Sequence, residues 1–285
     1  MSEARDTAGH VPAQSSARDW LTRPLFGLLM AAATVGAAWL GGAWFAALIA
    51  IAIAAAAREW HRMFARTFAP YMAVTIVSVV VALTASCGVL KAPSTFAWAM
   101  LMGGTIANFS LASFRREEPA WQGFGVLYLG ISSVAMVMLR MKAPEAFWLV
   151  VTLFAAVWAT DTGALVFGNL VGGPKLAPIL SPKKTWAGLF GGLACAVVAG
   201  AAIAALLGGD AVRGGLFGAG ASIAAHAGDL FESWVKRKVG RKNSGNLIPG
   251  HGGVLDRIDS IIMAAPVCAV VVLGLGFNPL LGVNP

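Results

Sequence analysis

Long apolar runs separated by short polar stretches dominate the chain. A helix that crosses the hydrocarbon core of a bilayer needs about 20 residues, and runs of this kind without period-two alternation are typical of helices rather than of barrel strands. The pattern therefore predicts an all-α polytopic integral membrane protein with about nine transmembrane helices. The expected spans are residues 25–41, 43–57, 71–90, 95–112, 123–141, 145–168, 187–208, 211–229 and 260–282.

The polar stretches between the runs predict the domain organisation. Residues 1–24 are polar and lack the basic start and short apolar core of a signal peptide, which indicates a disordered cytoplasmic tail. Residues 25–141 are expected to hold the N-terminal and middle transmembrane helices. Residues 142–285 are expected to form a catalytic transmembrane region, because the charged loops 168–187 and 230–259 lie there.

Composition supports a membrane protein and argues against a nucleic-acid partner. Of the 285 residues, 58% are apolar and only 12% are charged, whereas soluble domains are about 25% charged. The formal net charge of +8 could suit nucleic acid. The basic residues, however, lie in short loops between apolar runs, where anionic lipid is the better partner. We therefore expect a lipid bilayer and no nucleic acid.

The distribution of Lys and Arg predicts the orientation. With nine spans and a cytoplasmic N-terminus, all but four of the 21 Lys and Arg fall in cytoplasmic segments. The four outside are Lys91, Arg140, Lys142 and Arg213. This bias follows the positive-inside rule and places both charged loops in the cytoplasm, where nucleotides are found.

Three arginines follow the second apolar run. Arg58, Arg62 and Arg66 recur at every fourth position, so they share one face of a helix. The simpler interpretation is a positive-inside anchor that touches lipid headgroups. The alternative is a role in holding a lipid phosphate.

An acidic residue, Asp161, lies in an apolar stretch near the cytoplasmic end of the sixth span. An ionisable side chain at membrane depth is costly and indicates either a functional group or a structural pair with a neighbouring Lys or Arg. We include Asp161 among the candidate substrate-binding residues.

The loop that precedes the seventh span is a candidate phosphate site. Pro182 excludes a helix interior, so Ser181 lies in a turn or cap. A helix N-terminus that presents two hydroxyls and two Lys suits a phosphate group. The same pattern would also fit a Pro turn with interfacial lysines. The candidate residues are Ser181, Lys183, Lys184 and Thr185.

Three carboxylates are candidate metal ligands. Asp229 lies at the end of the eighth span, and Asp256 and Asp259 lie three positions apart on the first turns of the ninth. The three converge if those spans pack side by side. Hard oxygen ligands suit Mg²⁺, which typically bridges the phosphates of a nucleotide. The alternative is a salt-bridged cluster that ties the loop to the bilayer surface.

Basic side chains and a glycine loop lie between these carboxylates. On a helix, Lys236 and Arg237 share a face with Asp229. The glycines of the loop 249–253 let backbone N–H groups approach a ligand. The candidate phosphate-binding residues here are Lys236, Arg237, Lys242, His251, Gly252, Gly253 and Arg257.

Together these motifs resemble the phosphatidate cytidylyltransferases, also called CDP-diacylglycerol synthases. The resemblance rests on the run GDLFES at 228–233, the loop PGHGG at 249–253 and DRID at 256–259. The upstream runs DTGA and SPKKTW, which begin at Asp161 and Ser181, also fit. The match is at the level of motifs and covers about residues 158–262. Three residues depart from the family pattern, and none is an expected metal ligand: Leu165, Ala187 and Asn243.

The resemblance implies a nucleotidyltransferase of phospholipid biosynthesis. It would transfer CMP from CTP to phosphatidic acid and give CDP-diacylglycerol and pyrophosphate. The resemblance implies Mg²⁺ on Asp229, Asp256 and Asp259, which would act in catalysis with Lys236 and Arg237; a second, monovalent cation is left open. It suggests a homodimer in a bacterial-type inner (cytoplasmic) membrane, with the active site facing the cytoplasm.

Three other interpretations remain open at this point, and one is a non-catalytic paralogue, in view of Asn243 and Ala187. A CTP-dependent kinase of lipid alcohols would transfer the γ-phosphate of CTP instead of CMP. A cation or proton transporter would use Asp161 and Asp229 and would need no CTP, but it leaves the glycine loop unexplained.

Overall fold

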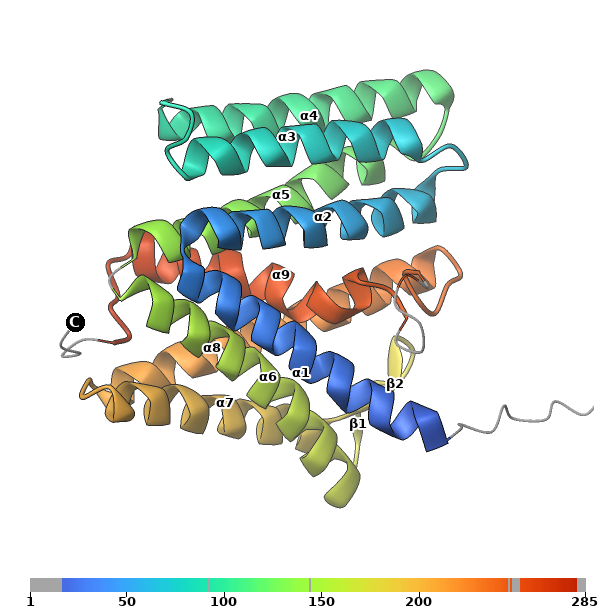
Figure 1. Cartoon of the computed structure of the whole chain (residues 1–285). Helices are drawn as coiled ribbons and strands as arrows, with labels where there is room; N and C mark the ends of the chain where they lie inside the picture. The colour runs from blue at the N-terminus through green and yellow to red at the C-terminus, as the bar shows by residue number, and fades with distance from the viewer. Residues whose placement is uncertain (1–16, 92, 144, 246, 248–251, 281–285) are drawn as a thin grey trace, which may run out of the picture.

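The computed structural model describes residues 17–91, 93–143, 145–245, 247 and 252–280, with the backbone alone for residues 17–26 and 94. These residues form nine α-helices, a short π-helix η1 and one small sheet (Figure 1). The elements are α1 (Ala17–Leu40), α2 (Gly42–Phe64), α3 (Ala69–Ser86), α4 (Ser94–Arg115), α5 (Pro119–Lys142), α6 (Ala146–Leu170), β1 (Lys175–Ala177), β2 (Ser181–Thr185), α7 (Trp186–Leu206), α8 (Ala211–Lys238), α9 (Leu255–Ala269) and η1 (Val270–Gly274).

Six of the described helical segments are long and apolar enough to cross a membrane. They are α2, α3, α5, α6, α7 and the segment Leu255–Gly274, which joins α9 to η1. The described apolar part of α1 is shorter, at Gly27–Leu40. The chain is therefore an integral membrane protein of mainly helical fold, and the count of nine spans stays a prediction.

The helices form two groups with α9 between them. Helices α2 to α5 lie on one side of α9, α6 to α8 lie on the other, and α1 crosses in front of α6 (Figure 1). The buried apolar residues form two clusters, and α9 contributes to both: Ala264 packs in one and Ile262 in the other. This arrangement places the N-terminal turns of α9 where both groups meet.

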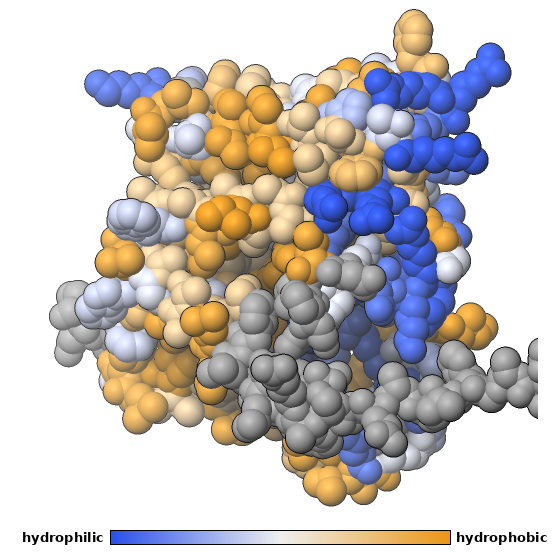
Figure 2. All heavy atoms as spheres, turned by 45° about the vertical axis from the view of Figure 1, so that its right-hand side comes forward, coloured by the Kyte–Doolittle hydropathy of each residue, from blue (hydrophilic) through white to orange (hydrophobic). Residues whose placement is uncertain are grey.

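Successive helices run in opposite directions, so alternate connections gather at one end. The connections α2–α3, α4–α5, α6–α7 and α8–α9 lie together on the right of Figure 1, where α1 also begins. Hydrophilic surface gathers on this side, whereas hydrophobic surface covers most of the remaining visible face (Figure 2). The two charged loops expected from the sequence thus lie at the same end of the molecule.

The expected all-α fold needs one correction. The loop 168–187 contains an antiparallel hairpin in which Lys175 pairs with Thr185 and Ala177 pairs with Ser181. A hairpin at this place is physically reasonable, because it pairs backbone groups of a Pro-containing segment that a helix cannot accommodate.

Several helix ends also differ from the expected bounds. Helix α1 begins at Ala17, inside the expected tail 1–24, and α2 continues to Phe64. Helix α8 continues to Lys238 and α9 begins at Leu255, so the polar connection between them is shorter than the expected loop 230–259. Charged residues extend these helices beyond their apolar runs, which is why hydropathy alone missed the ends.

Helices α7 and α8 approach closely through small residues. A Cβ added to Gly200 would overlap the carbonyl of Gly214, and one added to Gly214 would overlap the carbonyl of Gly200. Small residues of this kind let transmembrane helices pack backbone against backbone. This contact sets the position of α8, which carries much of the charged cluster.

We expect Gly214→Val to destabilise the protein by at least about 2 kcal/mol, because the new side chain has to push two helix backbones apart. Thermal unfolding in detergent measures the effect. Gly220→Val is the matched control on the same helix, since a Cβ at Gly220 meets no atom within 4 Å. Equal unfolding midpoints for the two variants would contradict this account of the packing.

Candidate active site

A cavity of about 1010 Å³ opens among α1, α6, β2, α8, α9 and the loop that follows α8. One part of its wall is apolar, and the other part is charged. The apolar part is formed mainly by Met30, Ala31, Phe154, Val157 and Trp158. The charged and polar part is formed by Asp161, Lys183, Lys236, Lys242, Asn243, Asp256, Arg257 and Asp259, with Gly252 beside them.

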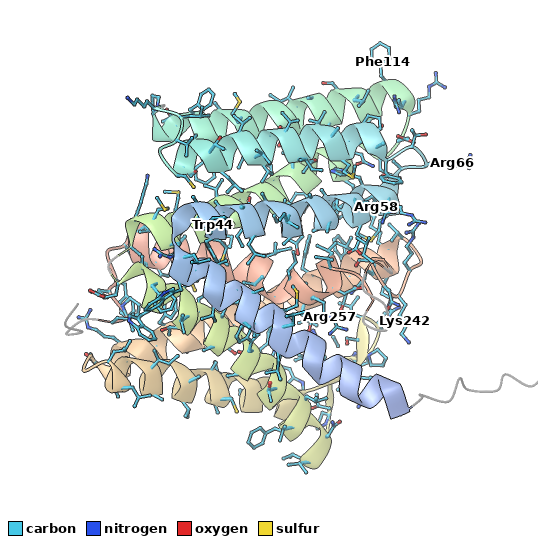
Figure 3. The ribbon with its side chains drawn as sticks, viewed as in Figure 1. Trp44, Arg58, Arg66, Phe114, Lys242 and Arg257 are labelled. Atoms are coloured by element: carbon cyan, nitrogen blue, oxygen red, sulfur yellow. The ribbon has the colours of Figure 1, made fainter. Side chains whose placement is uncertain are left out.

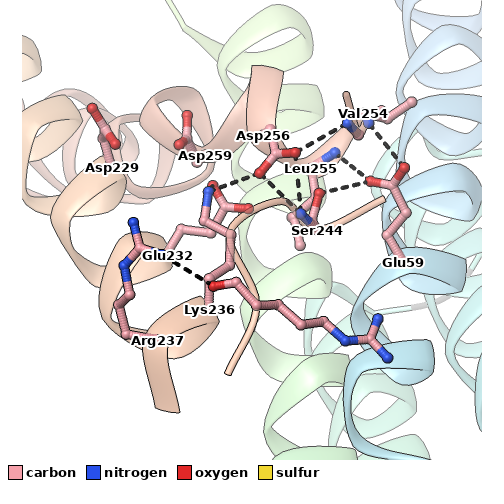
Figure 4. Close-up of polar contacts among 12 residues, drawn as sticks. Glu59, Asp229, Glu232, Lys236, Arg237, Ser244, Val254, Leu255, Asp256 and Asp259 are labelled. Carbon is pink, nitrogen blue, oxygen red and sulfur yellow. Dashed lines mark hydrogen bonds and ion pairs between the residues drawn. The ribbon is translucent and has the colours of Figure 1, made fainter. Parts of the chain in front are cut away.

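Asp256 joins three segments at the start of α9 (Figure 4). Its Oδ1 accepts a hydrogen bond of 2.7 Å from Lys236 Nζ, and its Oδ2 accepts bonds of 3.0 Å from Gly253 N and 3.1 Å from Ser244 N. Asp256 therefore fixes the loop after α8 against the first turn of α9.

Lys236 is the cation at the centre of this cluster. Besides Asp256, its Nζ lies 3.5 Å from Glu232 Oε2, one helical turn earlier on α8. Burial alone would lower the pKa of Lys236, but the charges of Glu232 and Asp256 outweigh burial and raise the pKa above its usual value. The ammonium group therefore stays charged at neutral pH.

Glu232 is a site residue that our sequence analysis did not single out. Its side chain is wholly buried, and neither carboxylate oxygen has a hydrogen-bond donor within the described residues. Asp259, also buried, is its neighbour across the interface of α8 and α9. The signal was its spacing, since Glu232 lies three residues after Asp229 on the same helix face.

Asp229 and Asp161 flank this pair of carboxylates. Asp229 Oδ2 lies 2.5 Å from Lys184 Nζ of β2, so an ion pair joins α8 to the hairpin. Asp161 of α6 lines the cavity together with Asp256 and Asp259 of α9. Four acidic side chains from three helices thus face one region, although no three of the described His, Cys, Asp and Glu side chains lie close enough to form a ready metal site.

The donor chemistry of this region nevertheless fits a divalent cation. Buried carboxylates normally have hydrogen-bond partners, and two neighbouring carboxylates repel each other. In the described part of the chain, Glu232 and Asp259 both lie near the ammonium group of Lys236, and no donor hydrogen-bonds to the oxygens of Glu232. The assignment of Mg²⁺ to Asp229, Asp256 and Asp259 stays a prediction, with Glu232 as a further candidate.

The four predicted site residues of strand β2 differ in the contacts that they make. Lys183 lines the cavity, whereas Lys184 pairs with Asp229. Thr185 is buried and caps α7, because its Oγ1 accepts a hydrogen bond of 3.1 Å from Gly188 N. Ser181 begins β2 opposite Ala177. Of these four predicted site residues, only Lys183 is thus brought into the wall of the cavity.

Arg237 is not among the residues that line the cavity. Its Nε donates to the carbonyl of Leu180 at 3.2 Å and its Nη1 to the carbonyl of Arg241 at 3.4 Å. Arg237 therefore ties the hairpin turn to the end of α8. Lys242, Gly252 and Arg257 do line the cavity, whereas Gly253 is buried beside it and His251 lies outside the described residues.

Glu59 of α2 is a second residue that sequence reasoning missed. It is buried at 2% exposure and accepts hydrogen bonds from Leu255 N at 2.8 Å, Val254 N at 3.1 Å and Ser244 Oγ at 3.2 Å (Figure 4). A Cβ added to Gly253 would lie 2.6 Å from Glu59 Oε2, so this glycine makes room for the carboxylate. No sequence pattern connects Glu59 with these partners, because they lie almost 200 residues away.

The sequence model described as "Cytidylyltransferase family" matches residues 21–274, which is most of the chain. The chain belongs to the cytidylyltransferase family. The match covers the cavity, both charged loops and all the helices that position them, so the family assignment rests on the region that carries the site.

Several relatives bear the name phosphatidate cytidylyltransferase. The one from Pseudomonas aeruginosa is 34% identical over 260 residues, which cover 84% of this chain and 91% of that protein. The one from Brucella suis is 48% identical over 149 residues, or 51% of this chain and 54% of the relative. A third, from Rickettsia bellii, is 38% identical over 142 residues, or 47% of this chain and 62% of the relative. The aligned part of the chain thus spans about half the length of the Brucella relative.

Proposed function

We propose that this chain is a phosphatidate cytidylyltransferase, which transfers CMP from CTP to phosphatidic acid and releases pyrophosphate. The observation that carries the proposal is the cavity whose wall is apolar on one side and charged on the other. Phosphatidic acid needs both, since its acyl chains require an apolar surface and its phosphate requires cations. CTP adds a triphosphate at the charged part. The names of the relatives support this choice of substrates.

The reaction requires positioning and charge neutralisation more than a general base. A phosphate monoester has a second pKa near about 6, so the lipid phosphate is largely dianionic at pH 7 and is already a nucleophile. One of its oxygens forms a bond to the α-phosphorus of CTP. The bond from the α-phosphorus to the oxygen that bridges to the β-phosphate breaks, and pyrophosphate leaves with those electrons.

The cations of the cavity would hold the two reacting phosphates close together. Lys183, Lys242 and Arg257 come from the hairpin, the loop after α8 and α9, so they surround the charged part from three sides. Bringing two anions into line is unfavourable without such neutralisation. Lys236, already held by Asp256, would stabilise charge that develops on the leaving pyrophosphate.

Carboxylates of α8 and α9 would hold Mg²⁺ on the same side. The expected ligands are Asp229, Asp256 and Asp259, and Glu232 adds a buried carboxylate without hydrogen-bond donors in the described chain. When bound, the ion would neutralise phosphate oxygens of CTP. Asp229 and Asp256 are now paired with Lys184 and Lys236; if these carboxylates held the ion, the two ammonium groups would be available to phosphate.

The proposal includes an orientation in the membrane. The end with the cavity and both charged loops would face the cytoplasm of a bacterial-type inner membrane, as the distribution of Lys and Arg predicts. CTP would enter from the cytoplasm, and phosphatidic acid would enter from the inner leaflet along the apolar wall. Nine membrane crossings and a homodimer are the corresponding expectations for topology and assembly.

Narrowing the apolar wall is expected to impair lipid binding selectively. Ala31→Trp places a large ring in the apolar part of the cavity, so KM for phosphatidic acid should rise about tenfold or more while KM for CTP stays within about twofold. Ala32→Trp, at the exposed neighbouring position, is the control. Steady-state kinetics in mixed micelles measure both constants. Equal changes in both KM values would contradict the assignment of this wall to the lipid.

Pyrophosphate release by the purified protein tests the proposed function itself. In detergent with Mg²⁺, release should require both CTP and phosphatidic acid and should not occur with a long-chain isoprenoid alcohol in place of the lipid. Release of CDP instead of pyrophosphate with CTP and the alcohol, as transfer of the γ-phosphate would give, or CTP-independent ion flux without any pyrophosphate release, would refute the proposal.

A further inference from the structure

A second, separate cavity of about 620 Å³ lies at the same end of the molecule. Four arginines line it: Arg58, Arg62 and Arg66 from the end of α2 and the start of the α2–α3 connection, and Arg241 from the loop after α8. Figure 3 shows Arg58 and Arg66 at this end, close to the connection that leads into α3. No residue that lines this cavity also lines the larger one.

The side chains of these arginines are not paired with acids within the described residues, although Glu117 accepts a hydrogen bond of 3.3 Å from the backbone N–H of Arg66. Arg58 packs over the ring of Phe68 at 5.9 Å, which fixes its position without neutralising its charge. Like charges one helical turn apart, such as Arg58 and Arg62, destabilise a helix. An anion bound among them would remove this repulsion.

The rest of the wall indicates what kind of anion fits. Met63, Phe64 and Phe68 lie beside the arginines, and the first two are almost fully buried. Guanidinium groups bind phosphate oxygens in pairs. Phe68, which is only partly buried, offers an apolar surface beside them for the glycerol and upper acyl carbons of a lipid. The cavity lies at the end of α2, a candidate membrane-spanning helix, where headgroups of the bilayer are expected.

We propose that this arginine cavity binds the phosphate of an acidic phospholipid, as a site distinct from the proposed catalytic cavity. The shared chemistry is a phosphate group, which a lipid headgroup or a free polyphosphate could supply. The apolar wall and the place at the end of a membrane-spanning helix favour the lipid.

The position of Arg241 connects this site to the larger cavity. Arg241 lines the arginine cavity, and its neighbour Lys242 lines the other one. On α2, Arg58 is followed by Glu59, which holds Ser244 and the start of α9. A bound lipid would therefore restrain both ends of the segment that carries the catalytic residues.

Lipid binding by the detergent-purified protein, measured by native mass spectrometry, tests the proposal without any assay of activity. Wild-type protein should retain phosphatidylglycerol, an acidic lipid, in preference to zwitterionic phosphatidylcholine. Arg58→Gln/Arg62→Gln should weaken retention of phosphatidylglycerol about tenfold, because two charged hydrogen-bond donors are lost. The matched control is Arg115→Gln/Arg116→Gln, which removes the same charge from the end of α4, outside the cavity.

A second variant and a second ligand complete the test. Arg241→Gln changes the loop and leaves α2 intact. It should also weaken phosphatidylglycerol binding, and it tests the proposal even if the double variant fails to fold. Unchanged retention in both variants, or equal retention of the two lipids by wild type, would overturn the proposal. Inorganic pyrophosphate is the free-anion probe. If the variants lose pyrophosphate binding but keep phosphatidylglycerol, the lipid assignment is wrong.

Discussion

Asp256→Asn is expected to lower kcat about 100- to 1000-fold while the protein still folds. Asn keeps the shape of the side chain but has one acceptor oxygen for the donors that now meet in Asp256, namely Lys236 Nζ, Ser244 N and Gly253 N. The variant also leaves the ammonium of Lys236 without its closest counter-ion. The loss of a preorganised charged group in an active site typically has an effect of this size.

The rate should be measured at saturating CTP, phosphatidic acid and Mg²⁺, alongside the unfolding midpoint in detergent. Asp210→Asn is the matched control, because Asp210 caps α8 at the opposite end of the molecule through Val212 N and Arg213 N. It should retain near-wild-type kcat. If Asp256→Asn also turns over at a near-wild-type rate, Asp256 has neither a metal-binding nor a positioning role.

Glu59→Ala should destabilise the fold by about 3 kcal/mol and lower kcat at least about tenfold. The substitution leaves Ser244 Oγ, Val254 N and Leu255 N without their acceptor in a buried region, and each unsatisfied group costs about 1–3 kcal/mol. Because Asp256 directly follows Leu255, a loosened helix start misplaces the catalytic cluster. Glu59 is a positioning residue in this account, since it touches the loop and not the cavity.

The value of kcat per folded molecule separates positioning from a simple loss of folded protein. After correction for the folded fraction, kcat should stay low in Glu59→Ala and should partly recover in Glu59→Gln, which restores one acceptor oxygen. Glu117→Ala is the control, because Glu117 is likewise a carboxylate at this end of the molecule and accepts a bond of 2.5 Å from Tyr71 Oη. A kcat of Glu59→Ala equal to that of Glu117→Ala would show that the loop holds its position without Glu59.

The helices were predictable from the sequence because each is built around an apolar run. The helix ends were harder to predict. The charged residues Arg58, Glu59 and Arg62 continue α2, and a hydropathy pattern does not include them in the helix. The hairpin was missed for a similar reason: the pairing of Lys175 with Thr185 joins residues whose side chains carry no strand pattern.

The candidate site was predictable where its residues are close in sequence. Spacing alone placed Asp256 beside Asp259 and Lys236 on the face of Asp229, and Lys236, Asp256 and Asp259 do line one cavity. Contacts between distant segments could not be predicted from the sequence. The partners of Glu59 lie in another helix pair, and the ion pair of Lys184 with Asp229 depends on how the hairpin folds back onto α8.

Labelled CTP tests the central claim most directly. The purified protein is incubated with phosphatidic acid, Mg²⁺ and CTP that carries the label at either the α- or the γ-phosphate, and the lipid is then extracted. The proposed cytidylyl transfer predicts that the α-label enters the lipid and that the γ-label leaves as pyrophosphate. Entry of the γ-label into the lipid, or of neither label, would contradict it.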